Sequence, residues 1–226
     1  MNWRMNLYNI NKIAALICVL LSLVACDTKL SNNSRVAALP YYEDATFSPQ
    51  WLSSTAADLS NFHRIPDFEF LDQEGDTISQ ATINDKIYVA DFFFTTCPGI
   101  CPKMTNNMKL IQEAFQADDS VLLLSHSVTP EIDSVATLKK YAEAKGVDAS
   151  KWHLVTGARK DIYTLGRSFY FVEEDLGLRK GEDEFLHTEN FVLIDKDKHI
   201  RGIYNGLNKT AVNQLIADIK TLQKEG

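Results

Sequence analysis

The sequence predicts an α/β domain built on a mixed central sheet with helices on both faces. Apolar runs of strand length alternate with segments of helical periodicity along most of the chain. The run from Ile87 to Phe94 is almost continuously apolar, which is typical of a strand that helices cover on both sides. With 226 residues, of which 45% are hydrophobic, the chain can bury the core of one good-sized domain.

The order of the elements defines the topology within this class. An alternating segment at 67–71, a turn from Gln73 to Asp76 and a short strand at 77–79 predict an N-terminal β-hairpin before the strand at 87–94. The whole order, β-β-β-α-β-α-β-α-β-β-α, is that of a thioredoxin-like fold with an extra N-terminal hairpin. The later elements are expected as helices at 103–116, 131–145, 160–169 and 209–224 and as strands at 121–128, 153–156, 191–194 and 199–204.

Residues 1–25 have the pattern of a signal peptide. Arg4 and Lys12 give a positive start, and the apolar run that follows is shorter than the roughly 20 residues that cross a bilayer. The run ends in Leu-Val-Ala-Cys at Cys26, which resembles a bacterial lipobox, so we expect Cys26 to carry lipid. An uncleaved anchor helix or a plain secretory signal would explain the same run. Each of the three places the domain outside the cytoplasm.

Beyond the signal, we divide the chain into a tether at 26–62 and a domain at 63–226. The tether is polar and contains prolines without a sustained period, although its aromatic residues indicate that part of it packs on the domain. Asp27 resembles a signal for retention at the inner membrane, so we expect the domain at the periplasmic face of that membrane. The net charge of −7, with no basic stretch, argues against a nucleic-acid partner.

Two cysteines remain in the folded part, because Cys18 lies in the signal and Cys26 would carry lipid. These two, Cys97 and Cys101, are too close in sequence to act as a staple for the fold, so they indicate redox chemistry, metal binding or both. Pro102 predicts that a helix begins near Cys101, because proline fits the first turn of a helix and not its interior. Both sulfurs would then lie at a helix N-terminus, where the thiolate form is favoured.

His187 is a candidate for the nitrogen ligand that such a pair would need to hold copper. It precedes the strand at 191–194, in a loop that this topology brings next to the dicysteine loop (residues 94–101). Two thiolates favour Cu(I) and an imidazole accommodates Cu(II), so the three groups together suit copper in two oxidation states. We expect most of the other histidines to be solvated, with His126, at the end of a central strand, as a weaker second candidate.

Three stretches of the chain resemble the SCO/SenC family. The first is Thr95 to Pro102, with the pattern C-P-x-x-C-P, and the second is Trp152 to Gly157. The third is His-Thr-Glu-Asn-Phe-Val-Leu-Ile-Asp, which begins at His187. The similarity extends from about Ile65 to the C-terminus. It implies a membrane-anchored copper-binding protein that assists assembly of the copper centre of cytochrome c oxidase.

The resemblance also implies a site and partners. Cys97, Cys101 and His187 would bind copper as Cu(I) or Cu(II), and a Cys97–Cys101 disulfide would be the form that cannot be loaded. The expected partners are the copper-accepting subunit of cytochrome c oxidase, a thiol reductant and another copper chaperone. This is the work of a metallochaperone rather than an enzyme. Where many members carry aspartate in a V-D-P segment, this chain has Thr129, so no role of that aspartate carries over.

An extracytoplasmic thiol-disulfide oxidoreductase is the main alternative. Proteins of that class usually have two residues between the cysteines, and they carry a proline, commonly cis, in the loop that faces the dithiol. Here three residues separate the cysteines, and the stretch from Glu184 to Val192 has no proline. A peroxiredoxin-like peroxidase would need proline at Ala90 and threonine or serine at Phe94. We therefore expect copper binding ahead of thiol redox work.

Overall fold

The structure of the protein is a computed structural model that describes residues 33–53, 57–172 and 185–225. The expected signal peptide and the lipid-bearing Cys26 lie outside these residues. No helix among the described residues is both long enough and apolar enough to span a bilayer.

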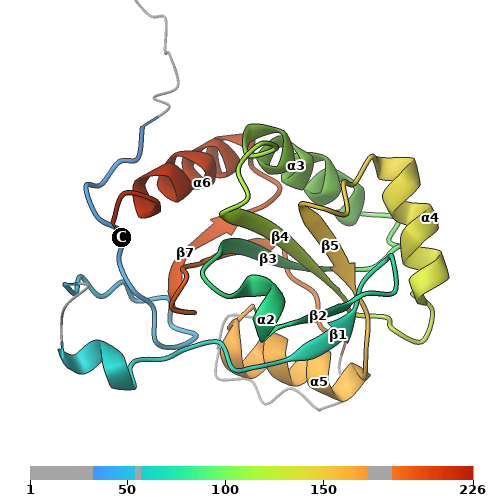
Figure 1. The fold of residues 1–226 in the computed structure, drawn as a ribbon, viewed down its shortest axis with the longest axis horizontal. Coiled ribbons are helices and arrows are strands. Elements are labelled where there is room, and N and C mark those ends of the chain that lie inside the picture. Colours follow the sequence, from blue (N-terminus) through green and yellow to red (C-terminus); the bar gives the residue numbers. More distant parts are fainter. Residues whose placement is uncertain (1–32, 54–56, 173–184, 226) are drawn as a thin grey trace, which may run out of the picture. The chain divides into compact units, whose positions relative to one another are not determined.

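The domain is built on a five-stranded mixed sheet with the strand order β5-β4-β3-β6-β7 (Figure 1). The two central strands, β3 (Ile87–Phe93) and β4 (Val121–Ser127), are parallel to each other and buried along their whole length. β5 (Trp152–Val155) extends the parallel part. β6 (Asn190–Ile194) and β7 (Ile200–Asn205) form an antiparallel hairpin beside β3. The predicted mixed sheet is thus confirmed.

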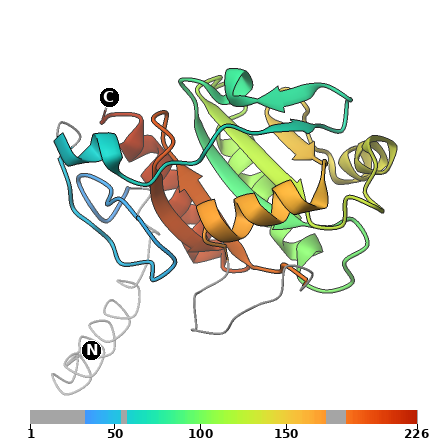
Figure 2. The ribbon, with the colours of Figure 1, turned by 90° about the horizontal axis from the view of Figure 1, so that it is seen from below.

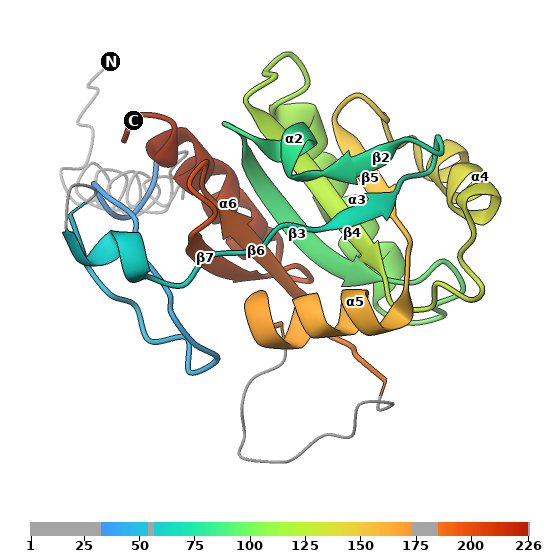
Figure 3. The same cartoon turned by 60° about the horizontal axis from the view of Figure 1, so that its bottom comes forward.

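Helices cover both faces of this sheet, as the sequence predicts. One face is covered by α3 (Cys101–Ala114), α4 (Val135–Lys145) and α6 (Lys209–Leu222), whose apolar side chains share one core cluster. The other face carries α5 (Arg159–Thr164), which continues into a π-helical turn, η2 (Leu165–Phe169), and crosses the strands in Figures 2 and 3. This fold is thioredoxin-like.

The N-terminal hairpin lies on the same face as α5. It consists of β1 (Glu69–Leu71) and β2 (Thr77–Ser79), which pair antiparallel and send Phe70 and Ile78 into the second core cluster. A single helical turn, α2 (Gln80–Ile83), follows directly. This turn was not expected from the sequence, because it is too short to show helical periodicity. Its start is fixed locally by a capping box in which Ser79 accepts from the backbone N–H of Ala81.

Most predicted boundaries agree with the structure to within two residues, and α4 is the exception. It begins at Val135 rather than near residue 131, because Ser134 caps it with a hydrogen bond from the backbone N–H of Thr137. The helix ends, as expected, at Gly146, whose φ of 68° is the left-handed conformation that glycine adopts without strain. The residues before Ser134 form a separate turn that later bears on the candidate site.

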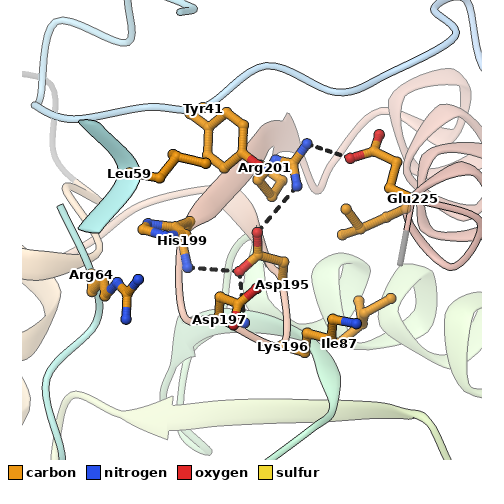
Figure 4. Close-up of a pocket in the computed structure, with 11 residues that line it drawn as sticks. Tyr41, Leu59, Arg64, Ile87, Asp195, Lys196, Asp197, His199, Arg201 and Glu225 are labelled. Carbon is orange, nitrogen blue, oxygen red and sulfur yellow. Dashed lines mark hydrogen bonds and ion pairs between the residues drawn. The ribbon is translucent and has the colours of Figure 1, made fainter. Parts of the chain in front are cut away.

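The N-terminal segment at residues 39–42, here called the strap, is held to β7 by one buried arginine (Figure 4). The Nη2 group of Arg201 donates to the carbonyl oxygen of Leu39 at 2.7 Å, and its guanidinium carbon lies 3.9 Å from the ring centre of Tyr41. The same guanidinium forms ion pairs with Asp195 at 3.1 Å and with Glu225 at 2.6 Å. Glu225 in turn accepts from the backbone N–H of Leu39, so the strap is tied from two sides.

The rest of the segment is not uniformly packed. Tyr42 extends the edge of β7 through a backbone bridge to Ile200, and Tyr41 pairs with Gln50. Trp51, by contrast, keeps 62% of its surface exposed. A short 3-10 turn, η1 (Ala57–Asn61), leads into the domain.

Candidate metal centre

The dicysteine loop begins where β3 ends and finishes at the first turn of α3. The backbone N–H of Cys97 donates to the carbonyl oxygen of Phe94 at 3.3 Å, which folds the loop back towards the strand. Cys101 is the first residue of α3, and Pro102 follows it in the first turn, where a missing N–H costs nothing. The predicted helix start is therefore confirmed, with Cys97 on the loop and Cys101 on the helix.

The two sulfurs are hydrogen-bonded to each other but have different surroundings. Burial alone would raise the pKa of Cys97, but hydrogen bonds from the thiol of Cys101 and from the backbone N–H groups of Gly99, Ile100 and Cys101 outweigh it. The pKa of Cys97 is therefore lowered, as the helix N-terminus predicts for a thiol on its approach loop. Cys97 is only partly buried, so its thiolate can be reached from solvent.

Cys101 differs from the expectation that both thiols favour the thiolate form. It is 4% exposed, and this burial, together with the hydrogen bond to Cys97, raises its pKa to about 12. The negative charges of Cys97 and Asp91 act in the same direction. The two thiols therefore differ, with a lowered pKa at Cys97 and a raised pKa at Cys101, and both sulfurs are free of a disulfide in this structure.

A buried polar network lies on β3 and β4, on the same face of the sheet as Cys101. Ser125 donates a short hydrogen bond to Asp91, and the indole Nε1 of Trp152 donates to Ser125 at 2.8 Å. Burial raises the pKa of Asp91 to about 7, so this carboxyl group is easily kept neutral. Asp91 is not among the residues predicted from the sequence, although one charged residue inside an apolar strand is a signal for a functional or network role.

A second buried carboxyl group, Asp133, holds the start of the dicysteine loop. Its two oxygens accept from the backbone N–H of Thr95 at 3.2 Å and from the hydroxyl of Thr95 at 2.5 Å. Asp133 lies in the turn between β4 and α4, 38 residues along the chain from Thr95. No local sequence pattern connects the two, so this contact was not predictable from the sequence.

His187 stands on the loop that leads into β6, and its neighbours fix that loop beside the dicysteine loop. The ring of Phe185 packs edge-on against Phe94, with 5.3 Å between ring centres. Leu186 is fully buried and lies so close to Gly166 that a side chain at Gly166 would clash with it. His187 follows these two residues directly, and it is exposed.

The other four histidines are packed, which corrects the expectation that most of them are solvated. His63, His153 and His199 each use a ring nitrogen in a hydrogen bond of 2.8–2.9 Å. His126 is fully buried and stacks on Phe92 with 4.8 Å between ring centres, on the face of the sheet that α5 covers. It is therefore a core residue on the face opposite the thiols and does not serve as a second candidate ligand.

The structure brings the two sulfurs together but does not place His187 with them in a finished cluster. Among the described residues, no three His, Cys, Asp or Glu side chains are grouped closely enough to hold a metal ion. The site residues thus consist of a paired dithiol and an exposed imidazole on an adjacent loop. Residues 181–184, which lead into the loop of His187, lie outside the described residues.

Comparisons with known proteins identify the family. Residues 56–224 match the family model described as SCO1/SenC. The chain belongs to the SCO1/SenC family. It is 31% identical over 162 residues to the SCO1 protein homolog of Bacillus subtilis, a match that covers 70% of this chain and 82% of that relative. It is 24% identical over 140 residues to a putative copper-binding protein of Stutzerimonas stutzeri, covering 61% of this chain and 67% of the relative.

Solved structures of SCO1/SenC proteins have the same fold. BsSco, a member of the Sco family of cytochrome c oxidase assembly proteins in which a disulfide switch has been identified, is 29% identical with a TM-score of 0.61, over 72% of this chain and 94% of that one. A SCO1/SenC family lipoprotein from Bacillus anthracis is 26% identical with a TM-score of 0.60, over 76% and 99% of the two chains.

Thr129, where this SCO1/SenC chain departs from the V-D-P pattern, has a definite place in the structure. Its hydroxyl donates to Asp133 at 3.1 Å, and its backbone N–H donates to the hydroxyl of Ser127 at 3.2 Å. The departure therefore falls at the contact between the β4–α4 turn and the dicysteine loop, not at the thiols themselves.

Proposed function

We propose that this protein binds copper outside the cytoplasm through Cys97, Cys101 and His187 and assists assembly of the copper centre of cytochrome c oxidase. The observation that carries the proposal is the asymmetric thiol pair, in which an accessible Cys97 of lowered pKa is hydrogen-bonded to a buried Cys101. Thiolates are the ligands that Cu(I) prefers, and the lowered pKa of Cys97 makes its thiolate easier to form. Membership of the SCO1/SenC family supports the same function.

The geometry suggests an order for loading. Cys97 offers the first thiolate, because it is partly exposed and its pKa is lowered. Cys101 then exchanges its proton for the metal, so loading releases a proton to solvent and becomes weaker as the pH falls. His187 completes the shell from the adjacent loop, which needs only a local movement because Phe185 already packs on Phe94. A shell assembled from two loops is open enough for an acceptor to displace its ligands in turn.

The same pair supports a redox control of loading. Thiol–disulfide exchange with a partner disulfide would join the two sulfurs as a Cys97–Cys101 disulfide and release the partner as two thiols. No thiolate then remains to bind copper, so a thiol reductant is needed to restore the protein. Cys97 is the attacking sulfur in this exchange, because it is the more accessible and more acidic of the two.

The proposal includes an anchor at Cys26. The Bacillus anthracis relative is a lipoprotein, which supports a lipid at the lipobox cysteine. The proposed place of the domain, at the outer face of the inner membrane, follows from Asp27 alone. Replacing Cys26 with serine is expected to release the protein from membranes or to leave its signal uncleaved. Unchanged processing and unchanged membrane association in the Cys26→Ser variant would show that Cys26 is not the anchor.

Metal analysis of the reduced full-length chain tests the ligand set. The wild type is expected to bind one copper ion and to show a thiolate-to-Cu(II) absorption band. His187→Ala is expected to lose that band and retain Cu(I), because two thiolates alone can hold Cu(I). Cys97→Ser and Cys101→Ser are each expected to bind neither Cu(I) nor Cu(II).

His63→Ala is the matched control for the imidazole. His63 is bound through Nε2 to the carbonyl oxygen of Phe169 at 2.8 Å, so its loss removes a histidine without touching the thiols. The control should keep the wild-type Cu(II) spectrum. A wild-type Cu(II) spectrum in His187→Ala would remove His187 from the ligand set and would favour the thiol-disulfide oxidoreductase, for which the same dithiol would suffice.

A further inference from the structure

Asp133 collects more hydrogen bonds from the vicinity of the thiols than its place in a turn requires. It is completely buried, and it accepts from the backbone and the hydroxyl of Thr95, from Ser127 at 2.6 Å and from Thr129 at 3.1 Å. Thr95 belongs to the dicysteine loop, whereas Ser127 ends β4 and Thr129 lies in the turn that follows it. A fully buried carboxyl group with four donors holds those donors in place, because a carboxyl group removed from water is costly to leave with fewer partners.

The hydrogen-bond cluster of Asp133 lies where the dicysteine loop leaves the sheet. Ser127 is the last residue of β4 and pairs in register with Phe93, the last residue of β3. Because β3 and β4 are parallel, the loops that follow them leave the sheet at the same end of the strands (Figure 3). Thr95 is two residues from Cys97, so a bond to Thr95 fixes the loop almost at the sulfur.

The turn that carries Asp133 is itself rigid. The backbone N–H of Asp133 donates to the carbonyl oxygen of Thr129 at 2.9 Å, and Ser134 caps α4 immediately afterwards. The carboxyl group is thus presented by a closed turn backed by a helix, and Thr95 is the part of the cluster that belongs to an otherwise glycine- and proline-containing loop. The turn therefore holds the loop, rather than the reverse.

We propose that Asp133 is a positioning residue for the dithiol, which acts by holding Thr95 so that Cys97 stays next to Cys101. This inference rests on the proposed function for its copper readout, and it stands independently for the thiol pair. Without the hold, residues 95–100 gain conformational freedom that must be lost again when the disulfide closes or when both sulfurs bind one ion. Both closures should therefore become less favourable, although Asp133 touches neither sulfur.

Asp133→Asn tests the proposal in the full chain, because asparagine keeps the shape of the side chain and loses one acceptor. The disulfide is followed by equilibration with oxidised and reduced dithiothreitol, differential alkylation and mass spectrometry of the peptide that contains both cysteines. We expect the disulfide to be about 10-fold less favoured in Asp133→Asn, which corresponds to a potential higher by about 30 mV. We expect copper affinity to fall by about 10-fold as well, as is typical when a group that orients a ligand is lost.

Asp72→Asn is the matched control for a loss of stability alone. Asp72 is also buried and also closes a turn, accepting from the backbone N–H groups of Glu74 at 2.9 Å and Asp76 at 3.0 Å, in the hairpin between β1 and β2. A substitution there should lower the free energy of unfolding and leave the disulfide equilibrium at its wild-type value. Equal shifts of the disulfide equilibrium in the two variants, or no shift in Asp133→Asn, would overturn the proposal.

If Asp133→Asn does not fold, two substitutions at Thr95 test whether its contact with Asp133 positions the dithiol. Thr95→Val removes the hydroxyl at nearly constant volume and should shift the disulfide equilibrium in the same direction as Asp133→Asn but by less. Thr95→Ser retains the hydroxyl and should restore the wild-type value, whereas a shift as large as that of Thr95→Val would contradict the proposal. If the wild type binds no copper but the disulfide shifts as expected, the copper function fails and the positioning role stands.

Discussion

Neighbouring residues of β3 and β4 point to opposite faces of the sheet, and the two faces have different surroundings: a hydrogen-bonded polar network on one and an aromatic cluster on the other. Asp91 of β3 and Ser125 of β4 are register partners on the face that α3 covers, and they share a hydrogen-bonded network with Trp152. Phe92 and His126, the next register pair, lie on the α5 face and stack with 4.8 Å between ring centres. On the α3 face these polar side chains are hydrogen-bonded to one another, whereas on the α5 face aromatic rings surround the imidazole of His126.

This difference shows how one sheet separates the reactive site from the part that mainly provides stability. On the α3 face, the charge of Asp91 reaches Cys101 and contributes to its raised pKa. On the α5 face, burial lowers the pKa of His126 to about 3, so the ring stays neutral within the core. Changes on the α3 face should therefore alter thiol chemistry, and changes on the α5 face should alter stability.

The largest expected effect is that of Phe92→Ala. Removing this buried ring leaves a cavity beside His126, and such losses cost about 3–5 kcal/mol of unfolding free energy. Denaturation in guanidinium chloride measures the loss, and Phe92→Leu gives a milder version if the alanine variant does not fold. The disulfide equilibrium of Cys97 and Cys101 should stay unchanged in Phe92→Leu. A clear shift would mean that the two faces are coupled.

Asp91→Asn should have the next largest effect, and it should depend on pH. Burial raises the pKa of Asp91 from 3.8 to about 7, so the folded protein binds a proton that the unfolded chain has released between these values. Wild-type stability therefore falls as the pH rises from about 4 to 7, by an amount on the order of 3 kcal/mol. Asparagine cannot ionise, so Asp91→Asn should lack this fall and be the more stable protein at pH 8.

The same variant also sharpens the contrast between the faces. Removing the charge of Asp91 takes away one cause of the raised pKa of Cys101, so that pKa should fall. Alkylation of the two thiols as a function of pH measures the change. An unchanged Cys101 titration in Asp91→Asn would show that the network beneath α3 does not act on the thiols.

The smallest effect is expected for His126→Phe, and only on the acid side. The unfolded chain takes up a proton at this histidine near its ordinary pKa of 6.5, whereas burial holds the folded pKa at about 3. Wild-type stability should therefore fall as the pH drops below 6.5, by an amount on the order of 2 kcal/mol by pH 5. His126→Phe should lack this slope, whatever its stability at neutral pH. An unchanged slope would assign acid unfolding to other groups.

The sequence was sufficient for features that depend on local pattern. The continuous apolar run of β3, the proline in the first turn of α3 and the glycine that ends α4 each have a physical cause within a few residues. The pairing of the two thiols was predictable for the same reason. The position of His187 before a strand made it a candidate and the family pattern supported it, and the structure leaves it exposed on a loop beside the dicysteine loop.

What the sequence did not yield depends on contacts between distant segments. Asp133 contacts Thr95 only because β3 and β4 are parallel neighbours, so no local sequence pattern near either residue predicts the contact. The raised pKa of Cys101 follows from burial that the fold creates, not from the helix start that the sequence predicts. His126 looked like a possible ligand because its strand position says nothing about which face it occupies.

The contacts of Arg201 with the strap affect the distance that the domain can reach from a membrane anchor. If Cys26 carries the lipid as proposed, about 13 residues separate it from Leu39, and even a fully extended chain of that length reaches at most roughly 45 Å. If no part of the tether packed on the domain, the chain would be free to about Ile65 and would reach roughly three times as far. With such an anchor, the hold of Arg201 would contribute to limiting how far the domain can stand from the membrane.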